Sequence, residues 1–459
     1  MRLYGLETEY GLAMPEGTPK TQIEDSRRVV CSCQVPHVTG WDYALETPRN
    51  DLRGFTASRL QHDPVDAQWD RDATRIDDER ADRILINGAR FYNDHGHPEY
   101  ATPECSRILE LVTHDVAGDR IAMQAAKQQG ATLYKNNSDY SGASYGTHEN
   151  YLVDRTIGYE RLATGLLPLM VCRQLFVGAG KVGSEVGKQC DYQLSQRADF
   201  MTEVAAVDTL YRRPIFNTRD EPHADREKWM RLHVICGDAN RSEWATAMKF
   251  GMMRIGLELV AIDEAPVWQL ANPVQAFSEV SRDTENCWRI GLHGGSWTTA
   301  PDVLGSYLAA ARQFLQGEDA EMDWILNEWE QALTDLKDDP TKLADRADWA
   351  AKLQLFSLYS DKWDVDTLRS VEMDYHDIDP EISLYTALVE SDRMRKLTDD
   401  ARVDDAITIP PNTRAKHRGE IISRQADRIE AIGWRRAIVA GEVIDFEVDT
   451  EPNTTEGAS

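Results

Sequence analysis

The alternation of apolar and polar residues predicts a strand in the segment from Ile84 to Cys105. After a short apolar run, Ala89 and Phe91 fall on one side of the chain, and Arg90 and Tyr92 fall on the other. A period of two is typical of a strand with one apolar and one polar face. The segment therefore presents charged and phenolic side chains on one side of a sheet.

A second alternation, from Arg2 to Gly11, predicts the first strand of the chain. It places Glu7 and Glu9 on the same face, about 7 Å apart along the strand. Adjacent carboxylates repel each other unless a cation lies between them, so we favour metal ligation at this face. The alternative is a half-exposed strand with a solvated face, but Leu3 shares that face.

Four side chains that suit phosphate and Mg²⁺ follow one another closely in the Ile84–Cys105 segment. Arg90, Tyr92, Asp94 and Glu99 supply a guanidinium, a phenol and two carboxylates. Hard divalent ions prefer oxygen ligands, and guanidinium groups grip phosphates. The spacing alone leaves a second interpretation open, a strand with a solvated face and a charged turn.

Amphipathic patterns predict helices that cover the sheet on its outside. These patterns run from Glu243 to about Glu264, from Asp302 to Lys337 and from Asp348 to Tyr359. Residues 15–83 are polar and irregular instead, which predicts a mobile loop insertion.

The domain organisation follows from these patterns and from one break. Pro410 and Pro411 mark a boundary near residue 400, so we expect a catalytic domain over residues 1–400. A helix and a strand on either side of Trp434 indicate a small carboxy-terminal domain, residues 401–448. Residues 449–459 are predicted to form a disordered acidic tail.

Charge and composition narrow the classes of function. The chain has 51 Lys and Arg against 78 Asp and Glu, a net charge of −27. Most of such a surface repels a polyanion, so nucleic acid is not expected as a partner. No apolar run approaches the roughly 20 residues that span a bilayer. Acids also replace the apolar core of a signal peptide at the amino terminus. We therefore expect a cytoplasmic protein without a membrane partner.

Basic residues and one histidine remain ambiguous. Several arginines and a histidine could form a patch that holds ATP phosphates or an acidic partner, or could simply pair with nearby acids. His148 lies among glycines that allow close approach of a ligand, but a lone histidine carries little weight. The residues of the patch are Arg197, Arg212, Arg213, Arg219, Arg231 and His233.

Long stretches of the chain resemble the family of Pup ligases and depupylases, which are relatives of glutamine synthetase and glutamate–cysteine ligase. The resemblance implies an α+β fold, in which a glutamine-synthetase-like curved antiparallel sheet forms a cradle. Helices would lie on the outer face, and a small carboxy-terminal domain would follow. The matching stretches include GLETEYG, NGARFYNDHGHPEYATPEC, YSGASYGTHENY, CRQLFVGAGKVG, SQRADF, RPIFNTRDEPHAD, RLHVICGDAN and TRAKHRGE.

The same resemblance implies a site for the cofactors ATP and Mg²⁺ in the cradle. Asp94 would be the catalytic carboxylate. The Mg²⁺ ligands would be Glu7, Tyr92 and Glu99, with Glu9 as a further one. The residues in contact with ATP would be Arg90, Thr102 and Trp434.

Within the family, the segment containing WDYALETP and DLRGF and the spacing DHGHPE resemble the depupylase branch. The implied activity is hydrolysis of the isopeptide bond between a Pup-like, ubiquitin-like modifier and a substrate lysine, or deamidation of the modifier's terminal glutamine. Asp94 would act as nucleophile or would activate water. The resemblance also implies a functional link to the proteasome. The alternative is a ligase that forms the same bond through a γ-glutamyl phosphate. A nucleotide-binding scaffold and a ligase for small amines are further alternatives.

Overall fold

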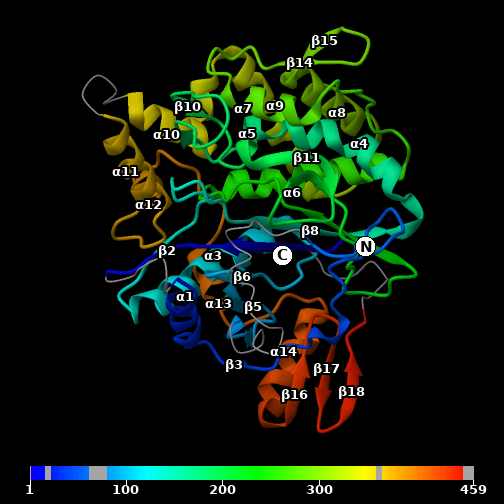
Figure 1. The fold of residues 1–459 in the computed structure, drawn as a ribbon, viewed down its shortest axis with the longest axis vertical. Coiled ribbons are helices and arrows are strands. Elements are labelled where there is room, and N and C mark those ends of the chain that lie inside the picture. Colours follow the sequence, from blue (N-terminus) through cyan, green and yellow to red (C-terminus); the bar gives the residue numbers. More distant parts are fainter. Residues whose placement is uncertain (1, 16–21, 61–79, 358–363, 448–459) are drawn as a thin grey trace.

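The computed structural model describes residues 2–15, 22–60, 80–357 and 364–447, and it is built around one large antiparallel sheet (Figure 1). The sheet has seven strands, and all of its neighbouring pairs are antiparallel. The expected α+β fold with a large antiparallel sheet is therefore confirmed. In sheet order the strands are β13 (Trp229–Val234), β8 (Thr147–Asp154), β1 (Tyr4–Glu9), β6 (His97–Ala101), β5 (Arg90–Asp94), β4 (Arg83–Leu85) and β3 (His37–Val38).

The central strand β1 shows the alternation that its sequence predicts. Tyr4, Leu6 and Thr8 are buried, whereas Glu7 and Glu9 lie on the opposite, partly exposed face. The predicted first strand is shorter than expected, because the chain leaves the large sheet after β1. It then forms β2 (Gly11–Ala13), which pairs with β7 (Thr132–Tyr134).

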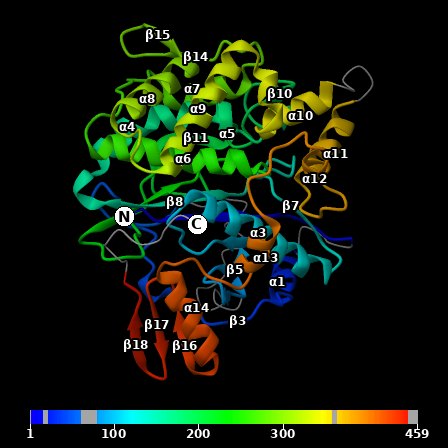
Figure 2. The ribbon, with the colours of Figure 1, turned by 180° about the vertical axis from the view of Figure 1, so that it is seen from behind.

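The apolar face of β1, β8 and β13 packs against a layer of helices, as predicted. Leu6 and Leu232 share one core with Leu111, Leu169 and Met248 of the covering helices. Figures 1 and 2 show this layer above the sheet. The main helices are α3 (Ile108–Lys127), α4 (Tyr159–Cys172), α5 (Gln174–Val177), α6 (Glu243–Ala261), α7 (Pro273–Arg282), α8 (Ala300–Phe314), α9 (Ala320–Asp338), α10 (Asp348–Ser357), α11 (Val365–His376), α12 (Leu384–Glu390) and α13 (Asp400–Ala406).

The helix predicted from Asp302 to Lys337 is in fact two helices, α8 and α9. The chain turns between them at Gly317, whose φ of 83° favours glycine. Asp319 then caps α9 by accepting a hydrogen bond from the Met322 N–H. The smaller sheets are β9 (Lys181–Val182) with β10 (Tyr192–Gln193), β11 (Met201–Ala206) with β12 (Arg213–Asn217), and β14 (Arg289–Gly291) with β15 (Trp297–Thr299).

The expected loop insertion, residues 15–83, contains regular structure. It forms α1 (Gln22–Cys31) and the edge strand β3, so the prediction of an irregular loop is wrong for these parts. Val29 and Val30 of α1 pack on Phe91 of β5 and Tyr100 of β6, opposite the polar face. A helix that buries so few apolar residues keeps a polar composition, so its sequence resembles that of an irregular loop. Residues 61–79 lie outside the described residues.

The carboxy-terminal part carries the predicted helix and strands at one end of the molecule (Figure 2). The expected boundary at residue 401 falls within α13, which packs on α3 through Val403 and Ala117. The small sheet is joined to the large one through Trp41 and Ile84. Its elements are α14 (Arg414–Gln425), β16 (Ile429–Ile432), β17 (Arg436–Val439) and β18 (Glu442–Asp445). The predicted tail, residues 449–459, lies outside the described residues.

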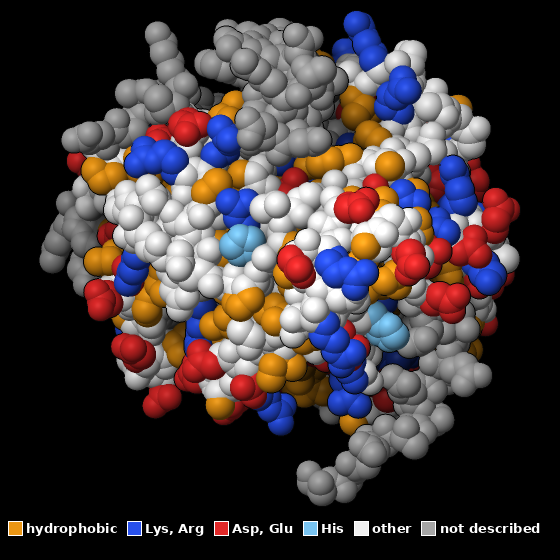
Figure 3. Space-filling model, turned by 90° about the horizontal axis from the view of Figure 1, so that it is seen from below, with side chains coloured by type: hydrophobic (Ala, Val, Ile, Leu, Met, Phe, Trp, Pro, Cys, Tyr) orange, Lys and Arg blue, Asp and Glu red, His pale blue; other side chains and the backbone are white. Residues whose placement is uncertain are grey.

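The surface mixes both signs of charge despite the net charge of −27. On the face seen from below, Lys and Arg side chains are interspersed with Asp and Glu (Figure 3). Within the described ranges, no helix combines the length and the apolarity needed to cross a membrane.

A buried ionic triad holds α14 against the large sheet. Glu104, which follows β6, forms ion pairs with Arg414 and with the fully buried Arg418. Burial opposes ionisation of Glu104, but the two guanidinium charges outweigh it and lower its pKa to about 2. The triad therefore contributes stability only while the carboxyl group is ionised.

Replacing Glu104 is expected to destabilise the protein strongly. In Glu104→Ala, Arg418 keeps a buried charge without its carboxylate, which costs about 3–5 kcal/mol in the free energy of unfolding. This loss in the free energy of unfolding has its full size above the pKa of glutamate in the unfolded chain, about 4.3. It disappears as the pH falls from there through the pKa of Glu104 in the folded protein. Denaturant unfolding of both proteins across this pH range measures it. Glu160→Ala, at an exposed position of α4, is the control, and an equal loss in both variants would contradict the prediction.

Candidate functional site

The register of the strands brings polar residues from distant parts of the chain into rows. Glu99 of β6 pairs directly with Glu9 of β1 on one side and with Tyr92 of β5 on the other. In the neighbouring row, Glu7 pairs with His148 of β8. Directly paired residues in antiparallel strands point to the same face. These side chains therefore share the polar face of the sheet.

Three carboxylates converge on this face. Glu9, Asp94 and Glu99 each place an oxygen within 4.8 Å of the others. The Tyr92 hydroxyl donates a hydrogen bond to Glu99. Burial, together with the negative charges of Asp94 and Glu7, raises the pKa of Glu99 well above its usual value. A cation between these oxygens would remove the repulsion, so this carboxylate cluster fits a hard divalent ion.

Glu7 belongs to a second cluster, with His148 and His233. Its Oε2 lies 3.2 Å from His148 Nδ1 and 3.7 Å from His233 Nε2. His233 is buried, and neither of its ring nitrogens has a hydrogen-bond partner within the described part of the chain. Burial and the neighbouring charge of Arg231 lower the pKa of His233 to about 3. The imidazole is therefore neutral and can offer a nitrogen lone pair to a metal ion.

The sequence alone does not single out these two histidines as site residues. As a lone histidine, His148 carries little weight, and His233 falls within the suggested cationic patch. His148 alternates with Asn150 on β8, which places both on the polar face. This alternation is the one signal in the sequence that pointed to His148. The pairing of β8 with β1 and β13 decides the rest.

A tight turn positions Asp94 at the end of β5. His95 and Gly96 have φ values of 46° and 92°, so both adopt the left-handed conformation of a two-residue hairpin. Arg80 Nη1 lies 3.4 Å from Asp94 Oδ1. Burial opposes ionisation of Asp94, but the positive charges of His95 and Arg80 outweigh it and lower the pKa of the carboxyl group. Asp94 is therefore ionised at neutral pH.

A cleft with about 580 Å³ of empty space opens beside Glu7. Thr102 and Trp434, two of the three residues expected to contact ATP, line it. The Thr102 hydroxyl accepts a hydrogen bond from the Leu6 N–H at 3.0 Å, which ties this wall of the cleft to β1. The Trp434 ring lies under the Arg418 guanidinium, 4.8 Å from its centre.

Arg90, the third of these residues, is not among the described residues that line the cleft. Its guanidinium is stacked between the rings of Trp41 and Tyr92, at 4.0 Å and 3.8 Å from their centres. Its Nε donates a hydrogen bond to Asp82 at 2.7 Å. Arg90 therefore supports Tyr92 directly, whereas Thr102 and Trp434 face the cleft.

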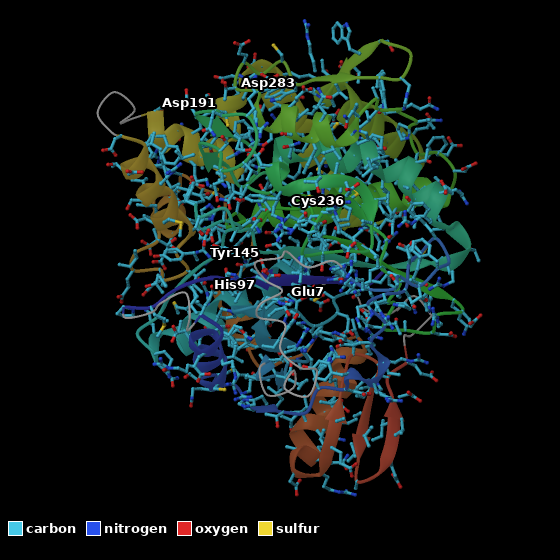
Figure 4. The ribbon with its side chains drawn as sticks, viewed as in Figure 1. Glu7, His97, Tyr145, Asp191, Cys236 and Asp283 are labelled. Atoms are coloured by element: carbon cyan, nitrogen blue, oxygen red, sulfur yellow. The ribbon has the colours of Figure 1, made fainter. Side chains whose placement is uncertain are left out.

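The arginines that the sequence suggested as one patch do not all reach the cleft, since Arg197 and Arg213 meet instead at Ser144. Arg231 lines the cleft, and its Nη1 lies 3.6 Å from Glu7 Oε1. Arg212 is exposed, whereas Arg197 is buried. Figure 4 shows Glu7, His97 and Tyr145 in the middle of the molecule, far from Asp191 and Asp283 near the top. The site is therefore central, and Arg231 is the member of the suggested patch that lines the cleft.

This arrangement combines three chemical features. Two clusters of oxygen and nitrogen ligands can hold divalent cations, an adjoining cleft is open to a ligand, and the carboxylate cluster itself contains an ionised aspartate, Asp94. Such a site suits the binding of a metal–nucleotide complex beside a reactive carboxylate.

Proteins of known sequence show the same organisation over most of their length. A depupylase from Acidothermus cellulolyticus is 40% identical over 467 aligned residues, which cover 95% of this chain and 90% of that protein. A Pup deamidase/depupylase from Mycolicibacterium smegmatis is 36% identical and covers 95% of this chain and 91% of its own length. A Pup–protein ligase from a Nocardioides species is 40% identical, over 75% of this chain and 81% of that protein.

Two solved structures share the fold. The complex between Pup and its ligase PafA matches with a TM-score of 0.79 and 29% identity, over 99% of this chain and 89% of that chain. PafA in complex with ADP matches with a TM-score of 0.74 and 30% identity, over 87% of this chain and 93% of that chain. The Pup-ligase protein family model matches residues 2–438. The resemblance seen in the sequence is thereby confirmed, and the chain belongs to the Pup-ligase family of enzymes.

Proposed function

We propose that this protein is an ATP- and Mg²⁺-dependent depupylase and Pup deamidase. The observation that carries the proposal is the ionised Asp94 within a carboxylate cluster, beside a cleft that is open to a ligand. The choice of branch is supported by the relatives, because depupylases align over 95% of this chain and a ligase of equal identity aligns over 75%.

The residues fit Mg²⁺ because three carboxylates and a phenol oxygen converge at one point, while the Arg80 guanidinium lies against Asp94. Glu9, Glu99 and the Tyr92 hydroxyl would hold one ion, and Glu7 with His148 and His233 would hold a second. Bound Mg²⁺–ATP would supply positive charge and phosphate oxygens beside Asp94. The single free lone pair of the neutral His233 imidazole would then be taken up by the second ion, while its other ring nitrogen carries the proton.

The nucleotide would occupy the cleft next to Glu7. Trp434 offers a flat apolar wall to a base, and Thr102 offers a hydroxyl group. Arg90 would act from behind Tyr92, adding positive charge close to the phosphates. The ADP complex of PafA supports nucleotide binding in this family. We expect ATP to be a bound cofactor and not a fuel consumed in each cycle.

Asp94 would break the bond between the modifier's terminal glutamyl group and nitrogen. As a nucleophile, its carboxylate attacks the γ-carbonyl carbon and forms an acyl-aspartate as the C–N bond breaks. The amine leaves with a proton from water, and the resulting hydroxide hydrolyses the acyl group. As a base, Asp94 takes a proton from water, whose oxygen attacks the same carbon, and passes that proton to the amine as the C–N bond breaks. Both routes need the ionised carboxylate. Mass spectrometry of rapidly quenched enzyme separates them, because only the first modifies Asp94.

The direction of the reaction separates the two branches. In a mixture of ATP, free modifier and a purified conjugate, we expect the conjugate to disappear and the target protein to regain its free lysine amine. ADP should not form in proportion to the bonds cleaved. The ligase alternative, which the fold of PafA favours, predicts growth of conjugate with one ADP for each bond formed. A modifier ending in glutamine should release ammonia in the same assay if the protein is a deamidase. Conjugate growth with matched ADP release would contradict the proposed branch.

Gly146 is predicted to be essential for metal binding. A Cβ at this position would lie 2.8 Å from Glu9 Oε1 and closer still to His148 Nε2. Gly146→Ala must therefore displace a proposed ligand in each cluster, and we expect the Mg²⁺ concentration for half-maximal activity to rise about 10- to 100-fold. Gly305→Ala in α8, where the new Cβ meets Leu333 at an ordinary 3.7 Å, is the matched control. Equal Mg²⁺ dependence in the two variants would contradict the assignment.

The partners and location expected from the sequence stay predictions. They are a Pup-like modifier and its protein conjugates, a functional link to the proteasome, and a cytoplasmic location. The complex of PafA with Pup supports the first of these.

A further inference from the structure

Arg197 is a buried arginine whose guanidinium hydrogen-bonds to no acid among the described residues, although the charges of Glu9 and Asp238 act on it. Its side chain lies just before β11 and is 1% exposed. Within the described part of the chain, its guanidinium donates hydrogen bonds only to neutral oxygens, the Tyr145 carbonyl at 2.6 Å, the Ser144 hydroxyl at 3.0 Å and the Ile235 carbonyl at 2.8 Å. Its Nε has no partner among the described residues. Burying a charge in this way is costly, so a compensating role is expected.

The Tyr145 carbonyl connects Arg197 to Glu9 through one peptide group. The next N–H in the chain, that of Gly146, donates a hydrogen bond to Glu9 Oε2 at 2.7 Å. The Tyr145 carbonyl and the Gly146 N–H belong to the same planar trans peptide and point in opposite directions. Arg197 therefore holds the oxygen end of the peptide whose nitrogen end holds Glu9.

The neighbouring contacts leave this peptide little freedom. Arg213 donates a hydrogen bond to the Ser144 carbonyl at 2.8 Å, and Asn137 donates one to the Tyr145 carbonyl at 3.0 Å. The Gly146 carbonyl accepts a hydrogen bond from the Glu9 N–H at 3.1 Å. The positive charge of the Arg197 guanidinium, next to the Tyr145 carbonyl oxygen, also polarises the peptide and strengthens its N–H as a donor.

The consequence is a fixed orientation of the Glu9 carboxylate. Oε2 is occupied by the Gly146 N–H, whereas Oε1 lies 3.9 Å from His148 Nε2, between the two proposed metal clusters. We infer that Arg197 is a positioning residue of the cation site, which acts through the Tyr145–Gly146 peptide to hold Glu9 with Oε1 available to the ion. The inference rests on the proposed function in that Glu9 is taken as a metal ligand.

Binding of Mn²⁺ to the full chain, followed by the electron paramagnetic resonance of free Mn²⁺, tests this role without an activity assay. Arg197→Lys keeps the charge but cannot make all three hydrogen bonds, so we expect Mn²⁺ to bind about ten-fold more weakly than to the wild type. In the assay, the Mg²⁺ concentration for half-maximal activity should rise by a similar factor, with kcat restored at saturating Mg²⁺.

Arg173→Lys is the matched control. Arg173 is also buried, at 2% exposure, but it is paired with Glu149, which faces the helical layer. This variant should lower the melting temperature and leave Mn²⁺ binding unchanged. Because Arg197 is proposed to act on the ion through Glu9, Arg197→Lys should not weaken Mn²⁺ binding further in a protein that already carries Glu9→Gln. If Arg197→Lys does not fold, Arg197→Gln carries the same measurement.

The outcomes are distinct. A folded Arg197 variant with wild-type Mn²⁺ affinity overturns the inference, as does full additivity with Glu9→Gln. A wild-type protein that binds no Mn²⁺ overturns both the cation site and the inference. A wild-type protein that binds Mn²⁺ with the expected Arg197 dependence, but cleaves no conjugate, overturns the proposed function and supports the role of Arg197.

Discussion

Asp94→Asn is expected to abolish hydrolysis of conjugates, with a loss of about 10⁴-fold or more in kcat. The amide can neither attack a carbonyl carbon nor take a proton from water, so both proposed routes fail. The amide fills the same volume at the end of β5 and still fits the hairpin turn at His95 and Gly96. It also removes one negative charge from a crowded cluster, so the fold should be retained.

The measurement pairs turnover with nucleotide binding. Single-turnover cleavage of a purified conjugate gives the rate, and titration with Mg²⁺–ATP gives the affinity, which should stay close to that of the wild type. Asp366→Asn, at a side chain that is 92% exposed, is the control for the same chemical change. A fully active Asp94→Asn would remove Asp94 from the mechanism, and loss of ATP binding alone would make it a ligand and not the reacting group.

Glu99→Gln is expected to have opposite effects on stability and on function. Without a cation, Glu99 is 1% exposed and faces the carboxylates of Glu9 and Asp94. Glutamine cannot ionise, so it avoids the burial and repulsion that raise the pKa of Glu99. The free energy of unfolding should therefore rise by the Coulomb energy of one pair of charges about 5 Å apart, about 3 kcal/mol at an effective dielectric near 20. The same substitution removes a proposed ligand, so Mg²⁺ should bind at least about 100-fold more weakly.

Thermal unfolding with and without Mg²⁺–ATP, at one pH, tests both the gain in stability and the loss of Mg²⁺ binding. The variant should melt above the wild type in chelator and gain much less from the cofactor than the wild type gains. Glu110→Gln is a useful control, because this acid lies on α3, outside both metal clusters. If Glu99→Gln lowered the melting temperature in chelator, the carboxylates would not repel each other there. A cation would then not be needed to offset repulsion within the carboxylate cluster.

The polar face of the strands could be predicted because alternation is a local property. The period of two along a strand places Glu7 and Glu9 on one face of their strand. It likewise places Arg90 and Tyr92 on one face of theirs. The two-residue hairpin after Asp94 also has a local cause, since Gly96 accepts a left-handed conformation. The long matching motifs then identified the family, which no periodicity could have done.

The helix α1 and the position of Arg90 could not be predicted in this way. Val29 and Val30 are too few to mark a helix in a polar segment, and their value lies in contact with Phe91 and Tyr100 from other strands. The stacking of Arg90 between Trp41 and Tyr92 likewise joins residues from separate segments, and the expected contact of Arg90 with ATP stays a prediction. Both outcomes depend on packing between segments that are distant in sequence.

The sequence by itself determined which side chains each strand presents to its polar face, Asp94 among them. Only the tertiary structure decided which of these side chains meet. Glu9 faces Glu99 and the Gly146 N–H, and Glu7 faces His148, because β6 and β8 pair with β1 in one register. Backbone hydrogen bonds between strands are the same for every sequence, so the register is set by the packing of the apolar face and by the turns. That packing assembles the two clusters, and it involves residues far apart along the chain.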